Sequence, residues 1–257
     1  MATKIEACLE KLFSDGFVVI ENFLTSHECS AFAKSLDSMI HEDHLIGLRD
    51  SRDSYMVHNP MLRDPIFLEI LRDSAMTALL SRVLGESFIL YAFTTSSLPA
   101  GGTNWARRVH VDCPRLIPDY PTNMNVFIPL APMSQDNGGI ELLPRSQWTE
   151  QSPTIDEFES KRFIPKLEQG SLLVFYSRLW HSAGVNKSQV ARHAITMNFC
   201  RSYMRQRFDY PRMITREMMV GLDDRQRQLL GFNVRVPTSL DEYYLPQSER
   251  LYKTGQG

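Results

Sequence analysis

Three side chains that could together hold a metal ion stand out in the sequence: His110, Asp112 and, far along the chain, His181. His110 and Asp112 are two residues apart, and on a β-strand that spacing places both side chains on one face. We therefore expect residues 105–112 to form a strand that carries both groups. Two histidines and one carboxylate on one side of a metal are the ligand set of non-haem Fe(II) oxygenases, which leave further coordination positions open.

Arg192 follows His181 in a pattern that predicts a return of the chain to the same site. The apolar run 172–176 predicts a buried strand, residues 183–188 predict a turn, and residues 191–201 predict the returning strand. This return would bring Arg192 close to His181. A guanidinium beside a metal site suits the two-point binding of a carboxylate.

These residues, with several longer motifs, resemble the phytanoyl-CoA dioxygenase-like family of Fe(II)/2-oxoglutarate oxygenases. His110-x-Asp112, His181 and Arg192 match the metal and arginine motif of the family. Further matches, which appear in the family's order within residues 10–201, are Asp15–Ile20, Asp136–Gly139, Leu143–Ser146 and Gly170–Phe175. The chain departs from the usual pattern at two positions: Arg145 replaces a glycine, and Gln147 replaces a histidine.

The resemblance implies a double-stranded β-helix (jelly roll, cupin-like) core and an enzyme that oxidises a C–H bond of a small molecule. Iron would be held by His110, Asp112 and His181, and 2-oxoglutarate by Arg192, with O₂ as the oxidant. Hydroxylation, desaturation and cyclisation in the biosynthesis of a specialised metabolite all remain open. Halogenation is disfavoured because related halogenases have a small residue in place of the acid. Asn125 and Arg108 are further candidate cosubstrate contacts.

Two other classes of function stay open from the residues alone. A zinc metallohydrolase uses a similar ligand set with a bound water, although the sequence offers no obvious general base and no purpose for Arg192. A non-catalytic cupin-like binding protein would not need the three ligands and the arginine together. His41 and His44 form a possible second metal pair, but polar residues at a helix end are more often solvated.

The composition describes an ordinary globular chain. It has 257 residues, 43% hydrophobic and 23% charged, with a formal charge of −2, so we expect no bulk attraction to nucleic acid. We find neither a membrane-length apolar run nor the apolar core of a signal peptide. The four cysteines form no CxxC motif. We expect a cytoplasmic monomer or homodimer.

The element pattern predicts a mainly β protein with flanking helices, organised as one domain over residues 1–257. Helices over 3–13, 26–40 and 65–84 would buttress the core. A candidate lid spans 45–64, and helical segments near 214–221 and 223–230 would follow the core. The expected core at 86–201 contains short strands separated by turns, typical of a jelly roll. One expected strand, 17–20, precedes this core. The expected strands within it are 88–98, 105–112, 123–130, 140–143, 162–164, 171–176 and 191–201.

Two further patterns bear on the site. On the last strand, alternate residues such as Thr196 and Asn198 would face an active-site lumen, while Ile195 and Phe199 would pack on helices. Beyond it, arginines are frequent over residues 201–212. That stretch predicts arginines that are solvated, paired with acidic neighbours or in contact with an anionic partner.

Overall fold

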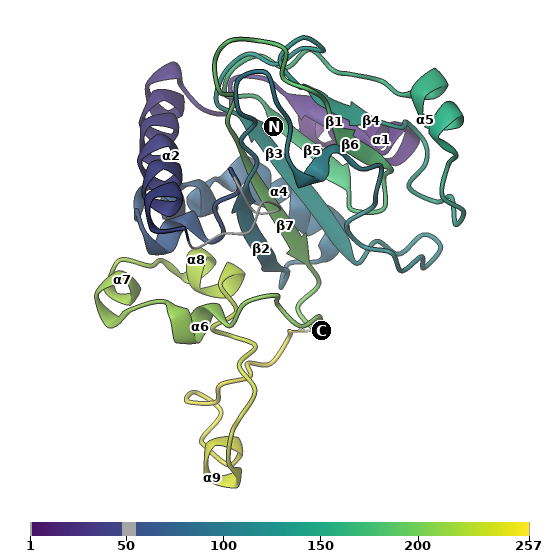
Figure 1. Cartoon of the computed structure of the whole chain (residues 1–257). Helices are drawn as coiled ribbons and strands as arrows, with labels where there is room; N and C mark the ends of the chain where they lie inside the picture. The colour runs from purple at the N-terminus through teal and green to yellow at the C-terminus, as the bar shows by residue number, and fades with distance from the viewer. Residues whose placement is uncertain (1, 48–54, 257) are drawn as a thin grey trace.

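The computed structural model describes residues 2–47 and 55–256 and contains two antiparallel β-sheets (Figure 1). The larger sheet has the strand order β1-β5-β3-β7-β2. Its strands are β1 (Phe17–Ile20), β2 (Ile89–Thr95), β3 (Asn123–Pro129), β5 (Leu172–Tyr176) and β7 (Ala194–Cys200). Every strand of this sheet lies within a predicted strand, because short apolar runs bounded by turn residues specify them locally.

The smaller sheet carries one of the predicted metal ligands. It pairs β4 (Ile140–Leu142) with β6 (His181–Ala183), so that Leu142 lies opposite His181. His110 adds to its edge through an isolated bridge to His181, in which each backbone N–H donates to the other residue's carbonyl at 3.0 Å. Residues of both sheets line a cavity between them. This is the expected mainly β core with flanking helices.

Helices cover the outer face of the larger sheet (Figure 1). α1 (Ala2–Asp15) packs on β1 and on α4 (Ser74–Leu84), and α4 also contacts β3. α2 (Ser26–Ile46) begins with a capping box, in which Thr25 and Glu28 satisfy each other's backbone N–H groups. Cys29, Phe32, Leu36 and Met39 form its buried stripe. The helices supply the apolar side of the core, which leaves the opposite face of the sheet to the cavity.

Three element predictions were wrong. The expected helix 65–84 is split into α3 (Ile66–Glu69), a 3₁₀ turn (η2, Ile70–Arg72) and α4, because Asp73 adopts an extended conformation and its side chain caps Met76 N–H. The expected strand 162–164 makes only a bridge from Phe163 to Leu142. It directly follows a helix that we did not predict, α5 (Ile155–Lys161).

The third wrong prediction is the ligand-bearing strand 105–112. The chain forms a 3₁₀ turn there, η3 (Trp105–Arg107), which the side chain of Asn104 caps, and only then becomes extended. Pairing is limited to His110, while Asp112 N–H and Cys113 N–H both donate to the Ser177 carbonyl. The local sequence does not make a strand; contacts with the β6 region hold this segment in place.

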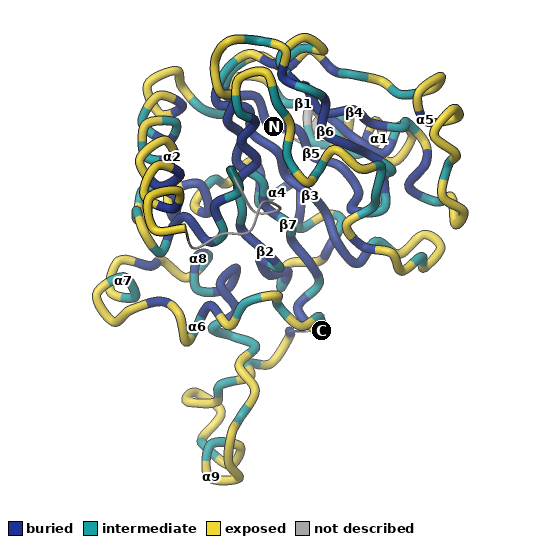
Figure 2. The backbone as a smooth tube through the Cα atoms, in the orientation of Figure 1, coloured by how far each residue is buried: buried dark blue, intermediate teal, exposed yellow. Residues whose placement is uncertain are grey.

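The C-terminal segment contains short helices, and it begins by packing against β2. Its helices are α6 (Tyr210–Met213), α7 (Arg216–Val220), α8 (Asp224–Leu229) and α9 (Leu240–Tyr243). Of these, α7 and α8 lie at the expected positions. Tyr210 is fully buried, and its hydroxyl accepts a hydrogen bond from Phe93 N–H at 3.0 Å. The arm that carries α9 projects from the body and is largely exposed, whereas the strands of the sheets are buried (Figures 1 and 2).

Two remaining expectations concern chain segments outside the core. Of the candidate lid at 45–64, residues 48–54 lie outside the described residues, while η1 (Pro60–Leu62) and the cavity-lining Met56 and His58 are within them. A search of the described helices finds none with the length and apolar character needed to span a membrane.

Candidate metal centre and cosubstrate site

A cavity of about 490 Å³ lies between the two sheets and contains the predicted metal ligands. Its lining combines polar side chains with apolar and aromatic ones such as Phe127 and Phe175. The predicted lumen-facing residues Thr196 and Asn198 are among them. Phe199, on the opposite face of β7, instead packs edge-on against Phe88 at 5.6 Å between ring centroids. The predicted alternation therefore holds at Thr196, Asn198 and Phe199, whereas Met197, between the two lumen-facing residues, also lines the cavity.

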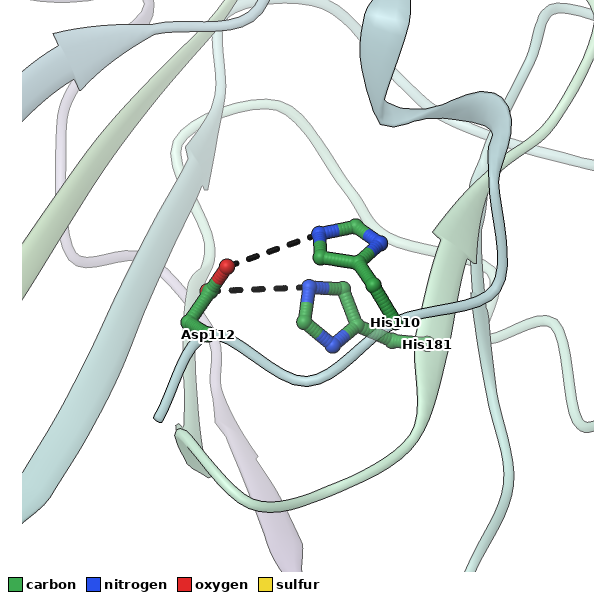
Figure 3. Close-up of side chains that lie close together, drawn as sticks. All are labelled: His110, Asp112 and His181. Atoms are coloured by element: carbon green, nitrogen blue, oxygen red, sulfur yellow. Dashed lines mark ion pairs between the residues drawn. The ribbon is translucent and has the colours of Figure 1, made fainter. Parts of the chain in front are cut away.

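His110, Asp112 and His181 converge in this cavity (Figure 3). One ligating atom from each lies within 4.8 Å of the others. The Nε2 atom of His110 is 3.4 Å from Asp112 Oδ1, and the Nε2 atom of His181 is 3.7 Å from Asp112 Oδ2. Two imidazole nitrogens and a carboxylate oxygen are thus directed at a common point, which is the donor set suited to a divalent iron.

Backbone carbonyls orient both imidazoles. His110 Nδ1 lies 2.6 Å from the Arg108 carbonyl, and His181 Nδ1 lies 2.9 Å from the Leu179 carbonyl. A carbonyl only accepts, so each Nδ1 carries the proton and each Nε2 presents its lone pair to the common point. Such outer contacts fix tautomer and ring orientation in metal sites. The residues present therefore fit a metal ion.

The pKa values of all three groups are shifted from their ordinary values. Burial lowers the pKa of His181 to about 4, which keeps its ring neutral. Burial alone would raise the pKa of Asp112, but the nearby His181 and His110 and a hydrogen bond from Asn125 outweigh it and lower that pKa to about 2. Burial opposes protonation of His110, yet its contacts with Asp112 and the Arg108 carbonyl leave the pKa of His110 raised. Carboxylate and neutral imidazole are the forms that bind metals.

A network of amides holds the Asp112 carboxylate. Asn125 Nδ2 donates to Asp112 Oδ2 at 2.5 Å, and the Asn125 carbonyl oxygen accepts from Ser177 Oγ at 3.0 Å and from Asn198 Nδ2. Asn198 in turn accepts a hydrogen bond from Asn123 at 2.8 Å. These side chains come from adjacent strands, β3 and β7, and from the turn after β5. Sequence analysis missed Ser177 and Asn123, because only the register of the sheet brings them together.

A buried carboxylate anchors the segment before His110 to the smaller sheet. Glu141 of β4 accepts a hydrogen bond from Ser182 at 2.8 Å, and Arg107 and Arg162 each approach its Oε1 to 3.7 Å. Ser182 is the neighbour of His181 on β6. The same carboxylate therefore contacts both chain segments that carry the histidines.

Arg192 lines the cavity from the start of the β7 segment and is only 2% exposed. Its guanidinium donates to the Ser96 carbonyl at 3.1 Å and to the Gly138 carbonyl at 2.5 Å, while Nε has no hydrogen-bond partner. No carboxylate of the described residues lies within ion-pair distance of it. Burial lowers the pKa of Arg192 to about 9, so it stays cationic at neutral pH. A buried cation without a counter-ion favours binding of an anion.

The glycines of the 136–139 motif allow this arrangement. Gly138 has φ +78°, and a Cβ there would lie 2.3 Å from Leu98 Cδ1 and 3.0 Å from Asn186 N. Only glycine fits both this backbone conformation and this close approach. The Gly138 carbonyl can therefore reach the Arg192 guanidinium.

Other predicted site residues lie elsewhere. Arg108 is exposed, its guanidinium lies 4.0 Å from the Trp105 ring centroid, and it does not line the cavity. Asn125 does line the cavity, but its amide is directed at Asp112. His41 is exposed, and His44 packs edge-on against Tyr55. Within residues 2–47 and 55–256, the three ligands named above form the one cluster of three or more metal-binding side chains.

Comparison with known proteins extends these observations. The family model for phytanoyl-CoA dioxygenase (PhyH) matches residues 13–194. An uncharacterised protein of Mycobacterium tuberculosis, Rv1501, is 31% identical over 267 residues, covering 99% of this chain and 97% of that protein. The dioxygenase andF of Emericella variicolor is 22% identical and covers 99% of this chain and 91% of andF.

Among solved structures, EctD from S. alaskensis with bound Fe superposes with a TM-score of 0.63 at 15% identity, covering 80% of this chain and 78% of that one. This likeness concerns the fold, and with the sheet arrangement it confirms the jelly-roll prediction. The motif resemblance is confirmed independently by the family model, which spans well over half of the sequence. The chain therefore belongs to the phytanoyl-CoA dioxygenase (PhyH) family.

Proposed function

We propose that this protein is an Fe(II)/2-oxoglutarate-dependent dioxygenase that oxidises a C–H bond of a small-molecule substrate. The observation that carries the proposal is the pairing, in one cavity, of a His₂Asp set with a buried arginine that forms no ion pair with the described residues. Family membership and the dioxygenase andF support the same reaction class. Hydroxylation, desaturation and oxidative cyclisation, as steps in specialised biosynthesis, all fit this cavity.

In this proposal each residue has a defined role. His110, Asp112 and His181 hold Fe(II), and Asn125 orients the carboxylate ligand. Arg192 binds the distal carboxylate of 2-oxoglutarate and so sets its orientation. The bound iron, with 2-oxoglutarate and O₂, supplies the oxidising power, and succinate and CO₂ are the co-products. The surrounding protein positions the substrate and limits access of water.

The hydrolase alternative receives less support. A hydrolase with this ligand set needs a general base beside the metal-bound water. Among the described residues that line the cavity, Asp112 is the only carboxylate, and it already belongs to the ligand set. The hypothesis of a non-catalytic binding protein does not account for the shifted pKa values of this cluster, which are typical of catalytic sites.

The proposal is tested by titrating 2-oxoglutarate into the anaerobic Fe(II) protein and following the visible charge-transfer band. Arg192→Lys keeps the charge but loses the planar two-donor fork. One charge-assisted hydrogen bond is worth about 1.5–3 kcal/mol, so we expect affinity to fall roughly ten- to a hundredfold. Arg192→Ala should cost more, while iron binding survives in both variants.

Arg201→Lys is the matched control, because Arg201 also donates to backbone carbonyls but lies outside the cavity. It should leave the affinity for 2-oxoglutarate unchanged. Unchanged affinity in a folded Arg192→Ala variant would contradict the cosubstrate role. Turnover of an ester or amide with Zn²⁺ and without O₂ would favour the hydrolase.

A further inference from the structure

A second arginine, Arg207, reaches the cavity from the opposite end of β2. Arg207 N–H donates to the Tyr91 carbonyl at 3.0 Å, near the start of that strand, whereas Arg192 pairs with Leu98 beyond its other end. At about 3.3 Å per residue, the two backbone anchor points are roughly 20 Å apart. The two guanidiniums therefore serve different parts of the cavity.

The position of Arg207 is fixed by its neighbours. Gln206 Nε2 donates to the Leu90 carbonyl at 2.7 Å, and the buried Tyr210 accepts from Phe93 N–H at 3.0 Å. Together with the Arg207 backbone bond, these contacts attach residues 206–210 to the edge of β2. The backbone of Arg207 is thus held beside the cavity by contacts that do not involve its own side chain.

The guanidinium of Arg207 is available to a ligand. Arg207 lines the cavity and is exposed, and its guanidinium lies 5.9 Å from the centroid of the Phe208 ring. No carboxylate in the described part of the chain lies within ion-pair distance of it. In the proposed function the cosubstrate carboxylate neutralises Arg192. The positive charge of Arg207 is then neutralised neither by the proposed metal ligands nor by the cosubstrate.

The surroundings of Arg207 indicate the rest of the ligand. The His58 ring lies 6.3 Å from that of Phe208 and lines the same cavity, as do Met56, Tyr91 and Trp105. The cavity that contains Arg207 and the proposed metal ligands therefore also has aromatic and apolar lining residues. Such a lining suits an apolar molecular body with one charged end.

The register of the sheet separates this charged end from the metal. Asn198 of β7 hydrogen-bonds to Asn125, which in turn hydrogen-bonds to Asp112. Asn198 also pairs with Ala92 of β2. Arg207 lies on the other side of β2, where its N–H bonds to Tyr91. Two strand spacings separate the backbones of Arg207 and Asn198, roughly 10 Å. An anion on Arg207 and the carbon to be oxidised would thus be different parts of one molecule, several bonds apart.

We infer that the substrate carries an oxyanion, a carboxylate or a phosphate ester, which Arg207 binds at the outer end of the cavity while an apolar body extends toward the metal ligands. This inference rests on the proposed function, because it assigns a substrate class to the same site. Both anions match the fork of a guanidinium.

The test is calorimetric titration of the anaerobic protein loaded with Fe(II) and saturating 2-oxoglutarate. The probes are two matched series: phenylpropanoate, phenylpropanamide and phenylethyl phosphate, and octanoate, octanamide and heptyl phosphate. We expect an anion in at least one series to bind at least tenfold more tightly than its amide. The preferred anion then identifies carboxylate or phosphate as the natural group.

Arg207→Gln should reduce that affinity roughly ten- to a hundredfold, to the level of the amide. Arg207→Lys should retain part of it as a point charge. Arg205→Gln is the matched control, because Arg205 is exposed, two residues away, and does not line the cavity. Since the Arg207 backbone makes the bond to Tyr91, circular dichroism and melting should show the variant folded.

The inference is overturned if no anion binds better than its amide to the wild type, or if Arg207→Gln binds the anion as the wild type does. The visible band of the Fe(II)–2-oxoglutarate complex tests the proposed function separately from anion binding. If that band never forms, the oxygenase assignment fails. Titration of the metal-free protein still decides the anion site, because Arg207 is not a metal ligand.

Discussion

At the scale of single residues, the hydrogen bonds of the Asn125 side chain define a role that the sequence alone did not indicate. Its amide donates to Asp112, and its carbonyl oxygen accepts from two neighbours, which fixes which end of the amide faces the carboxylate. Asn125 therefore acts through Asp112. Its effect should be on the metal and not directly on 2-oxoglutarate.

We expect Asn125→Ala to weaken Fe(II) binding by roughly ten- to a hundredfold, the usual cost of losing a partner of a metal ligand. Anaerobic metal titration measures this directly. Asn233→Ala is the control, because Asn233 bonds to Gln228 in the C-terminal segment. A variant that keeps its iron affinity but loses 2-oxoglutarate affinity would instead show that Asn125 contacts the cosubstrate.

The raised pKa of His110 makes metal binding depend on pH. In the metal-free protein the contact with Asp112 favours the protonated ring, and a metal must displace that proton. Fe(II) affinity should therefore rise with pH until His110 is neutral, with release of a proton to the solvent. Titrations in two buffers of different ionisation enthalpy measure the proton count. Equal heats in both buffers would contradict this prediction.

At the scale of elements, a buried histidine joins α2 to the segments that follow β2 and precede β7. His193 Nε2–H donates to Asp37 of α2 at 3.0 Å, and its Nδ1 accepts from Ser97 Oγ at 2.7 Å. The residues that precede Ser97 and His193, Ser96 and Arg192, form a hydrogen bond of the proposed cosubstrate site. The helix thereby braces the site from outside the sheet.

This contact should make the fold sensitive to acid. Burial lowers the pKa of His193 despite the attraction of Asp37, so the unfolded chain takes up a proton near the ordinary pKa of 6.5 while the folded chain resists. The contribution of His193 to the free energy of unfolding is therefore present above that pH and is lost as the pH falls toward the lower pKa of the folded chain.

Urea denaturation at pH 7.5 and 5.5, values that bracket roughly the ordinary histidine pKa, measures this loss. His193→Gln should lose less stability over this interval than the wild type. Substitution of the exposed His27 by Gln is the control and should behave like the wild type. An acid-induced loss that is the same in His193→Gln would assign the effect to other groups.

The elements that sequence reasoning predicted well are those whose signals are local. β1 was predicted with its observed bounds, and the β5 prediction began one residue early, because each is a short apolar run next to a glycine. Arg145 also fits its motif: it adopts φ +65°, a conformation that favours glycine, the usual residue of the family motif at this position. The helix α5 was missed although Thr154 and Glu157 form a capping box, a signal that was available.

The parts that could not be predicted depend on tertiary contacts. The extended segment at His110 is placed by one bridge to His181 and by the Ser177 carbonyl. The prediction that His110 and Asp112 face the same way succeeded although the strand it assumed does not exist. The sequence pattern also could not predict that Arg108 packs on Trp105, because side chains alternate between two faces only within a strand.

At the scale of the whole molecule, the metal ligands join segments that are far apart in sequence, so metal binding should stabilise the entire fold. A ligand at a hundred times its Kd contributes about 2.7 kcal/mol. For a chain of this size that corresponds to a rise in Tm of roughly 5–10 °C. Anaerobic differential scanning calorimetry with Fe(II) measures it. His110→Ala should abolish the shift, and a shift of equal size in that variant would place the metal elsewhere.

The buried guanidinium of Arg192 also bears on how turnover ends. If Arg192 binds the cosubstrate as proposed, its fork contacts a terminal carboxylate, the group that 2-oxoglutarate and succinate share. Succinate keeps that carboxylate after the reaction, so it should leave the cavity slowly and compete with fresh 2-oxoglutarate. The enzyme would then be governed by the cellular ratio of the two acids, and accumulated succinate would act as its product inhibitor.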